Sequence, residues 1–140
     1  MAKLQANQKN YKTAFTKHIH TYLNTEGSNV SRRLLLCYCV ECGLKCLIMK
    51  NNNIYRISQA SEEVAEVLGS HDFRRLLKEV NQAGNYKFKN FKTEYNEDVT
   101  PGNFHQICRY CINPKKGKSE HIKKYEGTLE EITEWLKEVI

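Results

Sequence analysis

The sequence lacks any apolar run long enough to cross a membrane. Its longest nearly apolar stretch, Leu34 to Met49, has 16 residues and is interrupted by Glu41 and Lys45, whereas a membrane-spanning helix needs about 20 apolar residues. The first residues, MAKLQANQKNYK, contain no apolar leader core, so we expect no signal peptide. No internal repeat or low-complexity tract is present. These absences favour a cytoplasmic, reducing location.

What is present fits one globular domain. The chain has 140 residues, of which 40% are hydrophobic and 27% are charged, enough for a core without covalent staples. We expect a flexible N-terminus over residues 1–10 and a single helical domain over residues 11–140. In a reducing compartment, the six cysteines are expected to be free thiols or metal ligands rather than disulfides.

Hydrophobic spacing predicts helices along most of the chain. A helical face begins at Tyr11, the break around Gly27 ends that helix, and a second helix is expected from Val30 to Lys50. SQASEEVAEVLG predicts a short helix ended by Gly69. HDFRRLLKEVNQAG predicts another, which starts after Ser70 or Asp72 and stops at Gly84.

The second half of the chain continues this pattern after one interruption. NYKFKNFKTEYNEDV alternates aromatic residues with lysines but lacks a partner strand, so we expect an extended loop. Thr100 and Pro101 predict the start of a helix through GNFHQICRYC, and Thr128 with Glu131 predicts a capping box at the last helix. The expected fold is all-α, an antiparallel bundle of four to five helices.

The cysteines of the second predicted helix allow three interpretations. Four fall within one stretch: Cys37, Cys39, Cys42 and Cys46. On a helix, three of them stack along one side beside Gly43, a poor geometry for zinc, although Cys108 and Cys111 could add ligands. A redox pair needs a thiol of lowered pKa near a helix N-terminus, whereas burial raises the pKa. We therefore favour packing, in which small residues let a neighbouring helix approach closely, and expect no metal and no cofactor.

Charged residues within the same helix are candidates for a structural or binding role. Glu41 and Lys45 are four residues apart and lie in apolar surroundings. A buried charge needs a partner, so we expect an ion pair between them. Glu41 could in addition orient a second cation, such as Arg109.

Several segments together resemble the HEPN superfamily of small helical domains. They are YCVECGLKCLIMK, GSHDFRRLLKEV, FHQICRYC and LEEITEWLKEVI, in that order between residues 30 and 140. The resemblance implies a four- to five-helix bundle, often a homodimer, in a toxin–antitoxin or anti-phage system. It also implies an RNA, a nucleotide, a cognate antitoxin or another protein as the partner.

Many members of that superfamily are metal-independent ribonucleases with an arginine followed, roughly four to six residues later, by a histidine. Arginine offsets phosphate charge and histidine transfers protons near neutral pH. Here Arg109 matches the arginine, but His105 precedes it by one helical turn, and His121 follows beyond Pro114 on an expected loop. We therefore keep two readings open, a binding protein with an incomplete signature and an active ribonuclease that uses Arg109 with His105 or His121.

Two further groups complete the candidate residues. His71 and Asp72 head a predicted helix and are expected to cap or pack there. Lys115, Lys116 and Lys118 belong to a chain with a net charge of +6, which suits an acidic partner such as RNA. The alternative interpretation is that this charge only keeps the surface of the protein hydrated. A third hypothesis is a regulator that binds only another protein.

Overall fold

Helices make up most of the described chain, as the sequence predicts. The computed structural model describes residues 4–27 and 29–140. Its regular elements are α1 (Gln8–Asn24), α2 (Val30–Asn51), a 3-10 turn η1 (Ile57–Gln59), α3 (Glu62–Leu68), α4 (Phe73–Glu79), β1 (Phe91–Lys92), β2 (Asp98–Val99), α5 (Phe104–Arg109) and α6 (Glu120–Val139). Three helices are long and three are short, so the all-α expectation is confirmed. Residues 1–3 of the predicted flexible N-terminus lie outside the described residues, and α1 begins three residues before the predicted start.

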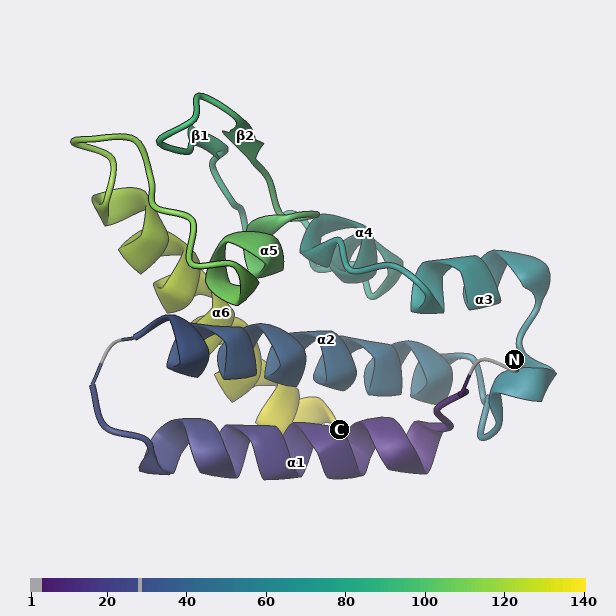
Figure 1. Ribbon diagram of the computed structural model, residues 1–140. Coiled ribbons are helices and arrows are strands. Elements are labelled where there is room, and N and C mark those ends of the chain that lie inside the picture. Colours follow the sequence, from purple (N-terminus) through teal and green to yellow (C-terminus); the bar gives the residue numbers. More distant parts are fainter. Residues whose placement is uncertain (1–3, 28) are drawn as a thin grey trace.

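Helix α2 is the centre of the molecule. It lies side by side with α1 in the opposite direction and also packs against α4, α5 and α6 (Figure 1). Its start is fixed by Asn29, whose side chain accepts a hydrogen bond from the Arg32 backbone at 2.7 Å. Gly43 faces α1 and α6 so closely that an added Cβ would lie 2.6 Å from Leu136 Cδ1 and 2.7 Å from Phe15 Cδ1. The predicted close approach at the small residues is therefore confirmed.

Helix α6 is longer than predicted. It begins at Glu120, so the capping box expected at Thr128 is wrong. Thr128 lies inside the helix and donates its hydroxyl to the Lys124 carbonyl at 3.0 Å, a bond that threonine makes readily within a helix. His121, expected on a loop, consequently lies in the first turn of α6 and is buried.

A buried charge cluster fastens α6 to the first two helices. Glu126 accepts hydrogen bonds from the Tyr22 hydroxyl at 3.2 Å and from Arg32 at 3.4 Å. Its other oxygen lies 3.4 Å from Arg33 Nε. The guanidinium of Arg32 also covers the Tyr22 ring at 3.8 Å. This cluster fixes where α6 crosses α2, and with it the residues that α6 presents on its outer side.

The short helices depart from the predicted boundaries in two places. Helix α4 is capped by Asp72, as predicted, but it ends at Glu79 and not at Gly84. Asn81 there adopts a left-handed conformation with φ of 59°, which asparagine tolerates and a continuing helix forbids. Helix α5 starts at Phe104 after Asn103, so Thr100 is not its cap. Thr100 instead begins a tight turn, in which its backbone N–H donates to Asn103 at 2.8 Å.

The segment predicted to be an extended loop contains a small hairpin. Tyr86 is half-buried and Phe88 buried, while Lys87 and Lys89 are exposed, so the predicted alternation is confirmed. The chain then pairs with itself, β1 with β2 in antiparallel register, because the partner strand lies within the same segment. No helix in the described part of the chain combines the length and the apolar character needed to cross a bilayer.

Candidate functional site

Two adjoining cavities lie at the end of the molecule where α6 begins. The first is about 310 Å³ and the second about 290 Å³, and both are lined by Lys89 and His121. Together they carry seven lysines and one histidine, which we call the basic groove: Lys87, Lys89, Lys92, Lys115, Lys116, Lys118, His121 and Lys124.

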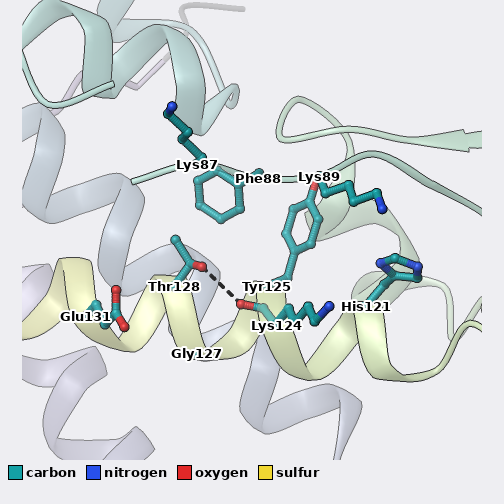
Figure 2. A pocket seen from close by; sticks show the side chains of 9 residues that line it. All are labelled: Lys87, Phe88, Lys89, His121, Lys124, Tyr125, Gly127, Thr128 and Glu131. Atoms are coloured by element: carbon teal, nitrogen blue, oxygen red, sulfur yellow. Dashed lines mark hydrogen bonds between the residues drawn. The ribbon is translucent and has the colours of Figure 1, made fainter. Parts of the chain in front are cut away.

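Three segments that are distant in the sequence form this groove. The extended segment after α4 supplies Lys87 and Lys89, held in place because Arg74 donates to the Phe88 carbonyl at 3.1 Å. The first two turns of α6 supply His121 and Lys124 on the opposite wall (Figure 2).

The third segment, residues 113–118, is fastened to the hairpin by backbone hydrogen bonds. Thr93 forms an isolated bridge with Pro114, and the Lys115 backbone donates to the Lys92 carbonyl at 2.9 Å. Lys116 is the next residue after Lys115, and Lys118 follows after Gly117. These bonds place the three predicted lysines of this segment beside Lys92 and His121.

The floor of the groove is aromatic. The ring of Tyr125 lies 4.8 Å from Phe88 and stacks on Phe104 at 4.3 Å, while His121 stacks on Phe91 at 5.5 Å with the two planes 6° apart. Burial raises the pKa of the Tyr125 hydroxyl well above its usual range, so this tyrosine is neutral at physiological pH. The rings support the chain segments from which the lysines extend into water.

The positive charge of the groove is largely uncompensated. Lys92 pairs with Asp98 at 2.8 Å, but the other six lysines form no ion pair with a carboxylate among the described residues. Cations of like sign held on one surface repel each other, and that repulsion is relieved when an anion binds. The groove is therefore suited to a ligand that carries several negative charges.

A second group of predicted residues gathers between α2, α4 and α5. Glu41 pairs with Lys45 at 3.2 Å, which confirms the predicted ion pair. Its other oxygen lies 2.7 Å from Nδ1 of His71, and the His71 ring lies 5.2 Å from that of His105. We call Glu41, Lys45, His71, His105 and Arg109 the polar cluster.

The second partner of Glu41 is not the arginine that the sequence suggested. The partner is His71, whereas Arg109 donates to the Tyr38 hydroxyl at 3.1 Å and remains exposed. Capping of α4 belongs to Asp72 rather than His71. We predicted a pair between Arg109 and Glu41 because both residues lie in helices of the expected bundle. The sequence does not show which side of α2 is covered by α5, and this decides the partner of Arg109.

His105 is the most unusual member of the polar cluster. It is 7% exposed, and its Nδ1 has no hydrogen-bond partner in the described structure. Burial lowers the pKa of its imidazole, and the charges of His71 and Arg109 lower it further. The Glu41 carboxylate acts in the opposite direction. His105 is thus a neutral, buried imidazole that lies one helical turn from Arg109.

The predicted site residues are therefore divided between two places. The structure brings His105 and Arg109 together on α5, whereas His121 lies in the basic groove, and no hydrogen bond, ion pair or ring contact of the described residues joins it to Arg109. Sequence reasoning did not single out Tyr38, Tyr125 or the lining residues further along α6. For the residues of α6 the signal was helical spacing from His121, which the misplaced start of α6 concealed, whereas no local pattern indicated Tyr38.

The six cysteines take no part in either place. All are free, and five are buried or half-buried. Among residues 4–27 and 29–140, no group of three or more histidine, cysteine, aspartate or glutamate side chains is arranged to hold a metal ion. The searches for relatives give no match to this chain among family models, curated proteins or solved structures.

Proposed function

We propose that the chain is a HEPN-like helical-bundle protein that binds RNA along the basic groove. The observation that carries the proposal is the set of lysines without acidic partners around two adjoining cavities. RNA presents a row of phosphates to such a surface, and binding gains free energy from the release of condensed counterions. The all-α architecture, with a long central helix at residues 30–51, supports the HEPN-like part.

The resemblance extends this proposal to the setting in which the protein acts. A toxin–antitoxin or anti-phage system, a cytoplasmic location and a homodimer all belong to the same proposal. Six free thiols suit a reducing compartment. Light scattering at micromolar concentration is expected to give twice the mass of the chain, and the mass of a single chain would contradict the homodimer.

Fluorescence anisotropy with a short labelled single-stranded RNA tests the binding itself. We expect Lys115→Ala, Lys116→Ala and Lys118→Ala in one chain to weaken binding by about tenfold or more at low salt, because three phosphate contacts are lost. The matched control replaces Lys9, Lys12 and Lys17, exposed lysines of α1, by alanine. Equal losses in the two triple variants would show that net charge, and not the groove, attracts the RNA.

The polar cluster favours a second candidate, cleavage of RNA without metal. His105, neutral and one turn from Arg109, supplies a proton acceptor beside a cation that can neutralise phosphate charge. Incubation of the purified protein with RNA in the presence of a chelator would then give products. Arg109→Ala and His105→Ala are expected to abolish these products. His121→Ala should still give products, because His121 lies outside the polar cluster. Cleavage that survives the Arg109 and His105 variants would exclude this site.

A further inference from the structure

The first cavity of the basic groove changes the sign of its charge along its length. At one end lie Lys89, Lys124 and His121, and at the other end lies Glu131, while the Lys87 side chain points away from α6 above Thr128 (Figure 2). His121 and Glu131 are ten residues apart on α6, or about 15 Å along the helix axis. A polyanion that enters past the lysines would therefore meet a carboxylate at the far end.

This arrangement has a consequence for an RNA strand in the groove. Toward the second cavity, lysines continue along the hairpin and the 113–118 segment, so a phosphate backbone is attracted over that whole length. Toward Glu131 the next phosphate would be repelled, because like charges held close together are unfavourable. The strand is thus expected to end in the first cavity.

The charge on the basic end of the first cavity also fits a strand terminus. Lys89 and Lys124 line it with His121, and neither lysine has a carboxylate partner among the described residues. An internal phosphodiester carries one negative charge, whereas a terminal phosphate monoester carries about −1.5 to −2 near pH 7. Lysine ammonium groups at one end of a cavity compensate the monoester better than the diester.

Gly127 provides an independent observation on the same cavity. It lies in the interior of α6, where glycine is less stable than alanine by about 1 kcal/mol. No neighbouring atom lies within 4 Å of an added Cβ, so the packing of the protein does not require a glycine there. Gly127 lines this cavity and also a separate cavity between α1 and α6, so its missing side chain leaves open space that adjoins both.

We propose that the first cavity binds a terminal phosphate monoester, with Lys89, Lys124 and His121 as its donors. The inference rests on the proposed function for its RNA-bound form, because the rest of the strand lies along the second cavity. A free nucleoside monophosphate carries the same group and would occupy the same cavity. Thr128 and Glu131, at the far end, offer partners for hydroxyl or amino groups of the terminal nucleotide.

Anisotropy with end-defined RNAs tests this inference. Four oligonucleotides of one sequence carry a phosphate or a hydroxyl at the 5′ end, or a phosphate or a hydroxyl at the 3′ end, with the dye at the opposite end. We expect a phosphate at one of the two ends to tighten binding by about tenfold relative to the hydroxyl. Gly127→Leu, which adds a bulky side chain at the wall of the cavity, and Lys124→Ala should bring that ratio close to one. Lys17→Ala on α1 is the control and should leave the ratio unchanged.

Calorimetry with adenosine 5′-monophosphate separates this inference from the proposed function. RNA binding without preference for either phosphate end would overturn the inference and leave the RNA proposal standing. Failure to bind RNA, with binding of the monophosphate that Gly127→Leu abolishes, would support the cavity and contradict the RNA proposal. If neither ligand binds, both proposals are wrong. A helix-favouring residue at position 127 keeps the fold intact, and circular dichroism checks this.

Discussion

The protonation state of single buried side chains limits the chemistry open to this protein. His105 is enclosed between α2 and the start of α4, with a ring nitrogen that no described group satisfies. Burial lowers the pKa of this imidazole, and the charges of His71 and Arg109 add to the effect. Glu41, on the facing side of α2, opposes it. His105 consequently stays neutral at pH 7, because protonation of its imidazole in the folded protein is unfavourable.

This lowered pKa predicts how stability depends on pH. In the unfolded chain His105 titrates near its ordinary value of 6.5, so below that pH the unfolded state binds a proton that the folded state resists. The contribution of His105 to stability is therefore complete above pH 6.5 and declines as the pH falls below it. Urea denaturation at pH 7.5 and pH 5 measures the effect, and His105→Gln should lose less stability on acidification than the natural chain.

An exposed histidine provides the control for that measurement. His20 lies on the surface of α1, and His20→Gln should keep the full loss of stability between the two pH values. An equal loss in the His105 and His20 variants would mean that the carboxylates of the protein, and not His105, cause the acid sensitivity.

Five of the six thiols are expected to be unreactive because they are buried or half-buried, including Cys108, whose pKa is lowered by a hydrogen bond with Cys37. Burial raises the pKa of Cys39 to about 12 and that of Cys42 to about 11, so at pH 8 only about one Cys42 side chain in a thousand is a thiolate. Cys111 is exposed. Titration with a chromogenic disulfide should thus show one fast-reacting thiol in the native protein and six after unfolding in urea. Cys111→Ser should remove the fast phase, and a fast phase that persists would contradict this assignment.

Among whole elements, the spacing between α1, α2 and α6 depends on the absence of one side chain. The Cβ of an alanine at position 43 would lie within 3 Å of both Phe15 and Leu136, closer than packed carbon atoms approach. Gly43→Ala is therefore expected to destabilise the protein by about 1–3 kcal/mol, despite the better helix propensity of alanine.

Gly127→Ala is the matched control in the same type of element. With open space around the added Cβ, it should stabilise the protein by about 0.5–1 kcal/mol. Urea denaturation of the two variants measures both changes. A neutral or stabilising Gly43→Ala would show that the helices can move apart without cost.

The sequence was most informative for the elements whose local signals agree with their surroundings. Asn29 caps α2 and a continuous apolar pattern follows it, so both ends of that helix were predicted within a residue. Local signals misled where the same residue type can form more than one kind of local hydrogen bond. Thr128 forms a helix-internal hydrogen bond instead of a cap. Thr100 closes a turn before α5, although a threonine followed by proline is typical of a helix start.

At the scale of the whole molecule, the site could be predicted only in part. Lys115, Lys116 and Lys118 were identified from their local charge, and the outward direction of Lys87 and Lys89 follows from the alternation with aromatic residues. Their convergence depends on the pairing of β1 with β2 and on the bridge between residues 93 and 114. These are contacts between segments that no local pattern specifies. The same is true of the approach of His71 to Glu41, which are 30 residues apart.

The distribution of charge over the molecule predicts how the proposed RNA binding would depend on salt. For a single strand, the logarithm of the association constant falls with the logarithm of the salt concentration by about 0.7 for each phosphate contacted. Replacement of Lys115, Lys116 and Lys118 by alanine should reduce that slope by about 2. Replacement of Lys9, Lys12 and Lys17 on α1 should leave it nearly unchanged, because long-range attraction to exposed charges is screened in the salt range used. Equal reductions in both variants would place the RNA on a diffuse basic surface rather than in the basic groove.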